Sequence, residues 1–205
     1  MDQVRRYFQS YSSSQRCPRV SALAYAPTHV TACTELPRRD HPTAIAALSD
    51  GTRLALRPTV PGDDERLRRM FYRLSPTTIY RRLFVPAPHA PHWADRFAAF
   101  GAVDEARRAL AALIGGEVVG IANYCRDTAN EAEIAIVVED SWQGRGVGGL
   151  LLASLTHEAV DRHIGVFTAR ILGDNARALR FVTRRFPTAS VRWDGGEYAL
   201  RIHLP

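Results

Sequence analysis

The spacing of apolar residues changes near residue 140, and this change marks the clearest structural unit of the chain. Within 131–138 (EAEIAIVV), Ile134, Ile136 and Val138 stand two residues apart, which predicts a strand. From Val147 to Ala159 the apolar positions recur three and four residues apart, which predicts a helix with one buried face. The pattern therefore predicts a strand that leads through a short glycine-rich turn into a long helix.

Shorter patterns predict the elements on either side of this unit. Acidic residues after Pro61, followed by an apolar stripe, predict the start of a helix. Ser75-Pro76 predicts the cap of a short helix that ends at Phe84. Gly120 interrupts a strand pattern, which indicates a bulge. The other expected elements are strands at 52–57, 107–114, 117–124, 166–172, 190–193 and 197–202, and helices at 93–100 and from Asn175.

The first part of the chain has no sustained periodicity. Residues 1–49 combine a serine run, several prolines and mixed charges, which predicts an extension in front of one domain at 50–205. Within the extension, the sequence leaves a short helix over 44–48 undecided. The apolar stretch 20–26 is short and has arginines close by, so it does not have the pattern of a signal peptide, and a cytoplasmic protein is expected.

The composition of the chain limits which kinds of molecule we expect it to bind. The 205 residues carry a net charge of +6, which favours anionic partners. The basic residues are spread along the chain without a nucleic-acid-binding motif, so no nucleic acid is expected. No apolar run approaches the roughly 20 residues that span a bilayer, so no membrane partner is expected. Cys17, Cys33 and Cys125 lack metal-site spacing, so we expect free thiols and no metal.

The turn between strand and helix has the composition of a phosphate site. Glycines allow backbone N–H groups to approach a ligand closely, and the start of a helix adds a positive dipole end. A P-loop requires Gly-Lys-Ser/Thr, which does not follow these glycines. A dinucleotide fold is disfavoured because 139–143 separate the strand from the first glycine, and because the candidate acid Asp174 comes too late.

The segment Gln143-Gly144-Arg145-Gly146-Val147-Gly148 resembles the Q/R-x-x-G-x-G/A pyrophosphate loop of the GNAT superfamily of acyl-CoA-dependent N-acetyltransferases. The similarity covers about residues 50–203. It includes Ala132-Glu133-Ile134 before the loop, and 175–181 (NARALRF), which is similar to the family's N-x-x-A-x-x-F/L helix. The resemblance implies an α/β GNAT fold, whose mixed and mostly antiparallel central sheet has helices on both faces, and it implies acetyl-CoA as cosubstrate.

The resemblance also implies roles for individual residues. The central strand would hold the pantetheine arm through its backbone, and the glycine loop would hold the pyrophosphate, with Arg145 adding charge-assisted contacts. Glu133 matches the family's catalytic glutamate and would act as general base toward the acceptor amine; Glu131 lies on the same strand face and remains the alternative. The expected cofactor contacts are Ile136, Val137, Val138, Gln143, Gly144, Arg145, Gly146, Val147, Gly148 and Asn175.

The acceptor side has its own motif. Residues 75–84 (SPTTIYRRLF) resemble the SP-x-x-x-Y-x-R-F-F segment of bacterial Pat-type protein lysine acetyltransferases, which implies substrate contacts at Tyr80 and Arg82. A protein lysine, for example on an acyl-CoA synthetase, is therefore the expected acceptor. Small amines remain an alternative. Val182 occupies the position at which many members carry a tyrosine acid, and this leaves a non-catalytic acyl-CoA sensor as a third reading. The oligomeric state stays open.

Overall fold

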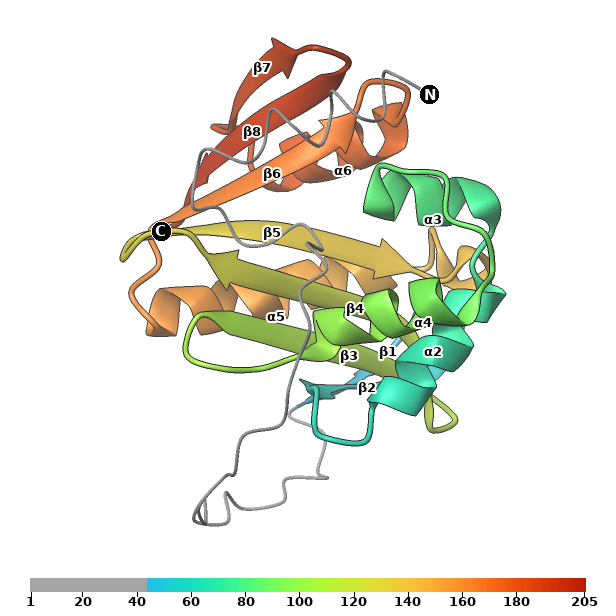
Figure 1. Cartoon of the computed structure of the whole chain (residues 1–205). Helices are drawn as coiled ribbons and strands as arrows, with labels where there is room; N and C mark the ends of the chain where they lie inside the picture. The colour runs from blue at the N-terminus through green and yellow to red at the C-terminus, as the bar shows by residue number, and fades with distance from the viewer. Residues whose placement is uncertain (1–43) are drawn as a thin grey trace, which may run out of the picture. The chain divides into compact units, whose positions relative to one another are not determined.

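The computed structural model describes residues 44–205, in which one eight-stranded sheet carries helices on both faces (Figure 1). The strand order is β1-β2-β3-β4-β5-β6-β8-β7, and every neighbouring pair is antiparallel except β5 and β6. The strands are β1 (Ala44–Ala47), β2 (Arg53–Pro58), β3 (Arg107–Ile114), β4 (Glu117–Arg126), β5 (Glu131–Val138), β6 (Val166–Leu172), β7 (Ser190–Asp194) and β8 (Glu197–His203). The helices are α2 (Asp64–Arg73), α3 (Pro76–Leu83), α4 (Pro91–Ala98), α5 (Val147–Asp161) and α6 (Ala176–Arg185), with 3-10 turns η1 (Ala99–Gly101) and η2 (Asp140–Trp142).

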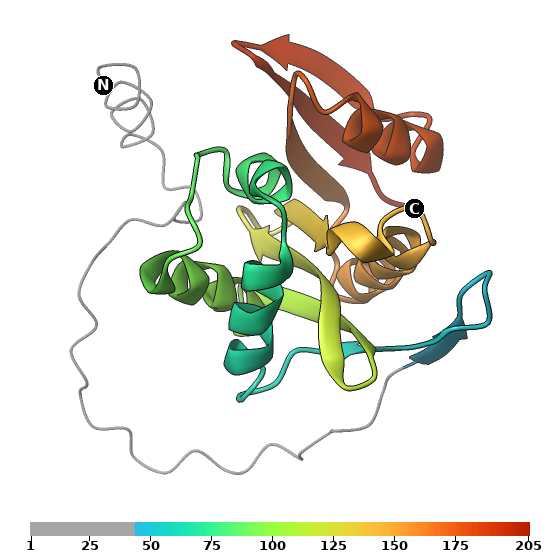
Figure 2. The same cartoon turned by 90° about the vertical axis from the view of Figure 1, so that its right-hand side faces the viewer.

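The sheet lies between two hydrophobic cores, one on each of its faces. Side chains alternate along a strand, so Leu110 of β3 packs on the face covered by α5 and Ala111 packs on the face covered by α2 and α4. Ile134 and Val137 divide β5 between the cores in the same way. Figure 2 shows the two helical layers on opposite sides of the sheet. The predicted fold class, an α/β mixed and mostly antiparallel sheet with helices on both faces, is confirmed.

The parallel pair β5–β6 is short. Its register covers only Glu131 to Glu133 of β5, opposite Val166 to Thr168 of β6. Beyond these residues the two strands separate, and Figure 1 shows them diverging toward α3. β5 keeps β4 as its partner from Ala132 to Val138. Among the described residues, the other edge of β5 from Ile134 to Val138 has no strand partner.

The structure decides one segment that the sequence left open, and it shows one expectation to be wrong. Residues 44–47 form strand β1, which pairs with β2, and not a short helix. Cys125 is disulfide-bonded and is not a free thiol. The division into an extension at 1–49 and a domain at 50–205 stays a prediction: residues 1–43 lie outside the described part, and 44–47 belong to the sheet. The bulge expected near Gly120 is present, because the β3–β4 register shifts beside Ala112, its partner.

Candidate functional site

The free edge of β5 forms the first half of the site. Ala122 pairs with Ile136 and Gly120 with Val138 on the β4 side, whereas no strand within residues 44–205 bonds to the opposite edge at these residues. Val137 is buried against the α2 and α4 core, so its side chain supports the strand. Backbone groups alternate between the two edges of a strand, so those of Ile136 and Val138 face the open edge and can bond to an extended ligand, while Val137 bonds to Ile121 of β4.

The glycine loop forms the second half and follows directly after η2. Gly144 and Gly146 have φ of 82° and 98°, a conformation that side chains with a Cβ seldom adopt. The first backbone bond of α5 runs from the Leu150 amide to the Gly146 carbonyl at 3.1 Å, so the preceding amides have no partner within the helix. These amides and the helix dipole favour an anion at this end of α5. Val147 is buried in the core, so only its backbone remains for a ligand.

Gln143 connects this loop to its surroundings. Its Nε2 donates to the Val138 carbonyl at 3.0 Å, which holds the loop against the end of β5. Its Oε1 accepts from Arg177 of α6 at 3.2 Å. As placed here, the side chain fixes the position of the loop.

Two predicted cofactor residues have protein partners in the structure. Arg145 pairs with Asp50 at 3.1 Å, in the turn between β1 and β2, and its guanidinium lies 4.8 Å from the centre of the Trp142 ring. Hydrogen bonds from Thr52 lower the pKa of Asp50, and the Arg145 charge acts in the same direction. Asn175 caps α6, its Oδ1 accepting from the Ala178 amide at 3.2 Å. Contacts of Arg145 and Asn175 with the cofactor stay predictions.

The two candidate bases on β5 differ in their surroundings. Both face the same side of the sheet, as expected for residues two apart. Glu131 forms a forked ion pair with Arg201 of β8, with Nη1 to Oε2 at 2.8 Å, and these hydrogen bonds lower its pKa. A carboxylate held in this way is a weaker base. Glu133 is half-buried at the point where β5 and β6 separate.

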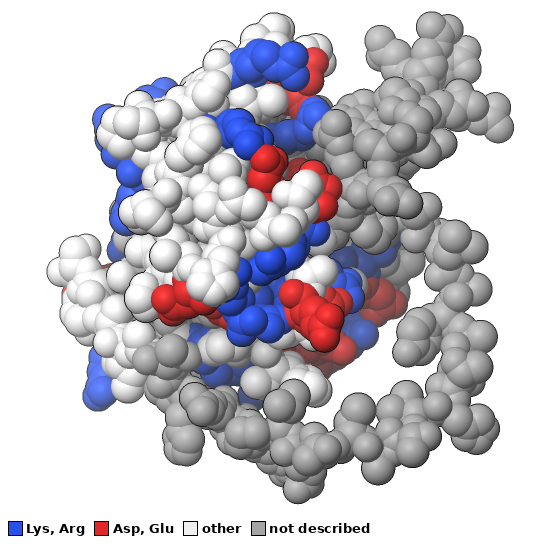
Figure 3. Space-filling model, turned by 90° about the vertical axis from the view of Figure 1, so that its left-hand side faces the viewer, with Lys and Arg blue, Asp and Glu red and all other residues white. Residues whose placement is uncertain are grey.

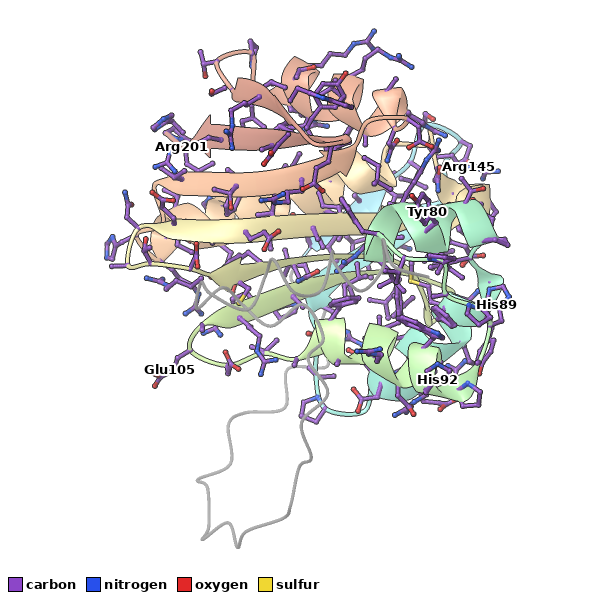
Figure 4. All side chains as sticks on the ribbon, turned by 45° about the horizontal axis from the view of Figure 1, so that its top comes forward. Tyr80, His89, His92, Glu105, Arg145 and Arg201 are labelled. Carbon is purple, nitrogen blue, oxygen red and sulfur yellow. The ribbon has the colours of Figure 1, made fainter. Side chains whose placement is uncertain are left out.

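Helix α3 brings Tyr80 and Arg82 to this side of the sheet. The Arg82 guanidinium lies 3.7 Å from the centre of the Phe100 ring and donates to Asn123 Oδ1 at 3.0 Å. Burial lowers the pKa of Arg82 to about 10, and the charge of Glu133 opposes this shift. Tyr80 is 39% exposed, and Figure 4 shows it at the same end of the molecule as Arg145. Arg82, Asn123 and Glu133 thus form one polar group under α3.

The start of α3 is joined to the turn that precedes the glycine loop, a contact that the sequence did not predict. Ser75 caps the helix, its hydroxyl accepting from the Thr78 amide at 3.2 Å. Asp140 in η2 accepts from the Ser75 amide at 2.9 Å and from the Thr78 hydroxyl at 2.7 Å. Burial acts to raise the pKa of Asp140, but these bonds lower it below its usual value. The Ser-Pro motif marked one partner, and nothing in the local sequence marked Asp140.

The edge of β5, the glycine loop and the two acids can be compared with known proteins. The family model described as acetyltransferase (GNAT) family matches residues 69–186. The chain belongs to this family. The acetyltransferase Pat of Mycolicibacterium smegmatis is 31% identical over 154 residues, which are 73% of this chain and 45% of that protein. The chain therefore spans about half the length of this curated relative.

Solved structures of GNAT proteins agree with this assignment. The GNAT domain of S. lividans PAT matches with a TM-score of 0.69 and 28% identity, over 80% of this chain and 100% of that one. A cAMP-binding acyltransferase from Mycobacterium smegmatis matches with a TM-score of 0.55 and 27% identity, over 79% and 47% of the two chains. The paia N-acetyltransferase of Thermoplasma acidophilum, solved with coenzyme A, shares the fold at 14% identity and a TM-score of 0.58, over 73% and 98%.

Features of the structure can now be compared with what GNAT proteins require. GNAT proteins use acetyl-CoA, and the β5 edge with its glycine loop fits an extended arm that ends in a pyrophosphate. Val182, at the position of the usual tyrosine, is buried in the core and has no acidic group to offer. Among the described residues, no group of three or more His, Cys, Asp or Glu side chains could hold a metal ion, and no helix is long and apolar enough to cross a bilayer.

Proposed function

We propose that this chain is an acetyl-CoA-dependent N-acetyltransferase that acts directly on a primary amine, with a protein lysine as acceptor. The observation that carries the proposal is the separation of β5 from β6 after Glu133. Within the described part of the chain, it leaves one edge of β5 without a strand, where the backbone groups of Ile134 and Ile136 can bond to the pantetheine arm, and that edge leads to the glycine loop at the start of α5. The thioester would then lie beside Glu133, where the two strands part.

The chemistry requires removal of two protons from the acceptor nitrogen: loss of the first allows the nitrogen to attack, and the second passes to solvent as the amide forms. A lysine side chain with a pKa of about 10.4 is an ammonium group at neutral pH and cannot attack a carbonyl. Glu133 accepts the first proton, directly or through water, and the amine nitrogen then bonds to the thioester carbon. A backbone N–H of β5 stabilises the oxyanion. The carbon–sulfur bond breaks, and the thiolate, of pKa about 8.5, takes its proton from solvent because Val182 offers none.

Glu133 is the proposed base because it matches the family's catalytic glutamate and lies where β5 and β6 separate, whereas Glu131 forms an ion pair with Arg201 of β8. The pair with Arg201 already stabilises the charged form of Glu131, which reduces its tendency to accept a proton. Glu133 lies in the polar group with Arg82 and Asn123, under the helix that carries the Pat-like segment. Tyr80 and Arg82 are proposed to contact the acceptor.

The protein-lysine acceptor is supported by the similarity to the two Pat proteins and by the segment at 75–84. An acyl-CoA synthetase with an exposed lysine is the proposed partner, and the cytoplasm is the proposed location, because acyl-CoA and such synthetases meet there. Small amines and a sensor without turnover are the competing functions. Because Val182 is buried and cannot donate a proton, it favours the sensor over an enzyme that needs a side-chain acid to protonate the leaving thiolate.

A competition assay separates these functions. The chain would be incubated with acetyl-CoA, an acyl-CoA synthetase and a polyamine, and acetylated products would be measured by mass spectrometry. The proposal expects acetyl-lysine on the synthetase at a rate above that of the polyamine, and little product with Glu133→Gln. Faster polyamine turnover would assign the chain to small-molecule acetylation. Binding of acetyl-CoA without any acetylated amine would assign the chain to the sensor function without turnover.

A further inference from the structure

Helix α6 carries an unbalanced positive charge. Its sequence, ARALRFVTRR, holds four arginines and no acid, and among the described residues none of these four has a carboxylate partner. Most other arginines of the sheet and helices are paired, for example Arg57 with Asp63, Arg73 with Glu139 and Arg201 with Glu131. On the face shown in Figure 3, acidic and basic side chains lie next to one another. Within residues 44–205, no carboxylate neutralises the charge on α6, and this charge can attract an anion.

One stripe of α6 lies against the glycine loop. A Cβ placed on Gly144 would meet the Arg177 guanidinium at 3.2 Å, and a Cβ on Gly148 would meet the Phe181 ring at 3.7 Å. A Cβ on Gly149 would meet the Arg185 guanidinium, with its Cζ at 3.2 Å. The three α6 residues are four apart and share one side of the helix. Two guanidinium groups thus lie beside the loop and the first turn of α5.

These guanidinium groups add to an electrostatic field that already favours anions. Loop amides and the α5 dipole attract negative charge, and the two guanidinium groups beside them would attract the same anion. The loop's own arginine, Arg145, is paired with Asp50. Arg185 stands where the family pattern has a glycine, so its charge is a property of this chain. A guanidinium fork matches phosphate oxygens and has no amine that an acetyl donor could modify.

We propose that Arg177 and Arg185 form the cationic side of the phosphate site and bind phosphate groups of CoA together with the loop amides. This inference rests on the proposed function. The phosphate could be the pyrophosphate or the 3′-phosphate of the nucleotide, and both have the same chemistry. Dephospho-CoA, which lacks only the 3′-phosphate, distinguishes them.

The test is calorimetric titration of the full chain with CoA and with dephospho-CoA at two salt concentrations. Arg177→Ala and Arg185→Ala should each weaken CoA binding about 10-fold, as expected for one charge-assisted hydrogen bond, and should flatten the salt dependence. If the replaced residue binds the 3′-phosphate, the variant loses affinity for CoA only. If the replaced residue binds the pyrophosphate, the variant loses affinity for both CoA and dephospho-CoA. Arg→Lys at either position should restore part of the loss.

Arg180→Ala is the matched control. It removes the same charge from the same helix, but Arg180 lies outside the stripe of Arg177, Phe181 and Arg185. The control should bind CoA within about twofold of the wild type. An Arg177→Ala/Arg185→Ala double variant that keeps its melting temperature and its CoA affinity would overturn the inference while leaving the proposed function intact, as would an equal loss in the control. A wild-type chain that does not bind CoA would overturn both.

Discussion

At the scale of single residues, Glu133 and Glu131 make the sharpest comparison, since they share a strand face and differ in their partners. Replacing Glu133 by Gln keeps the size of the side chain and removes its basicity. We expect the transfer rate at neutral pH to fall about 100-fold or more. The loss should shrink as pH rises, because solvent then deprotonates more of the amine. A pH–rate profile measures both effects.

Glu131→Gln is the matched control for this experiment. It removes a carboxylate two residues away, whose role in the structure is the ion pair with Arg201. Its rate should stay within a few-fold of the wild type, and CoA affinity should change little in either variant. A larger loss in Glu131→Gln than in Glu133→Gln would transfer the role of base to Glu131.

Single residues also show where sequence reasoning reached its limit. Gln143 and Asn175 could be selected from the motif because their neighbours in sequence form the same loop and cap. The pairing of Arg145 with Asp50 joins residues 95 apart, and the bond from Ser75 to Asp140 joins residues 65 apart. Such contacts depend on how the elements are packed, which periodicity does not describe.

At the scale of elements, Asp140 couples the acceptor helix to the cofactor loop. Asp140→Asn removes the charge that accepts from Ser75 and Thr78. Hydrogen bonds to charged groups contribute about 1.5–3 kcal/mol each, so the start of α3 should be less firmly held. We expect KM for the protein acceptor to rise about 10-fold, with a smaller change in CoA affinity. Steady-state kinetics and calorimetry measure the two quantities.

Asp174→Asn provides the control, since Asp174 is another carboxylate that interacts with α3, through Arg81 at 3.8 Å. That pair is largely exposed and contributes little. Acceptor kinetics should therefore be nearly unchanged. If Asp140→Asn behaves like this control, the contact at Asp140 does not position α3.

A second contact between elements, the ion pair of Asp63 with Arg57, should determine how the free energy of unfolding changes at acid pH. Asp63, 1% exposed, forms a forked pair with Arg57 of β2 at 2.6 and 2.8 Å. Burial acts to raise the pKa of Asp63, but the bonds from Arg57, the Val60 amide and Arg66 lower it. The resulting stabilisation is present above the unfolded pKa of about 3.9 and is lost as pH falls through the lower folded value.

Asp63→Asn leaves Arg57 buried without its counter-charge and should cost about 3–5 kcal/mol at neutral pH. The difference from wild type should narrow in acid, because wild-type Asp63 is then protonated as well. Chemical denaturation at several pH values measures this. Asp64→Asn, next in sequence and exposed, is the control and should change the unfolding free energy by less than about 0.5 kcal/mol. A parallel loss in both variants at all pH values would contradict the argument.

The elements themselves were mostly predictable, because their spacing is local. The change in the spacing of apolar residues around residue 140 predicted both β5 and α5, and Ser75-Pro76 predicted the cap of α3. The exception was β1. Its sequence, AIAA, is rich in alanine and lacks a turn of its own, and the strand is selected by pairing with β2. Tertiary pairing there outweighs local propensity.

At the scale of the whole molecule, the position of β1 decides how much of the chain the domain needs. β1 belongs to the sheet, Leu48 to the core beneath α5 and Asp50 to the pair with Arg145, so the domain includes residues from 44 onward. Removing 1–43 also removes Cys17 and Cys33, so the two proteins are compared under reducing conditions, where CoA binding should stay within about twofold of the full chain. Removing 1–49 deletes β1 and Leu48, which is buried in the core beneath α5, and should lower the melting temperature. Circular dichroism and calorimetry on both truncations test this, and an unfolded 44–205 fragment would show that the first segment is required.

The composition of the whole chain supplies the last prediction. All 27 of its Lys and Arg residues are arginines, so no side chain carries an amine that its own chemistry could acetylate. Incubation with acetyl-CoA alone should therefore leave every side chain unmodified in a mass spectrum. Arg82→Lys places an amine within the polar group that contains Glu133 and Asn123. That variant should acquire one acetyl group at residue 82.

The matched control is Arg180→Lys, which introduces the same amine on the exposed side of α6, away from β5. It should remain unmodified under the same conditions. Combining Arg82→Lys with Glu133→Gln should slow the modification about 100-fold, because the new lysine is then no longer deprotonated by the neighbouring carboxylate. Equal labelling of residues 82 and 180 would indicate non-enzymatic acetylation. Absence of labelling at 82, with CoA still bound, would place the thioester away from Glu133 and remove the basis for the proposed base.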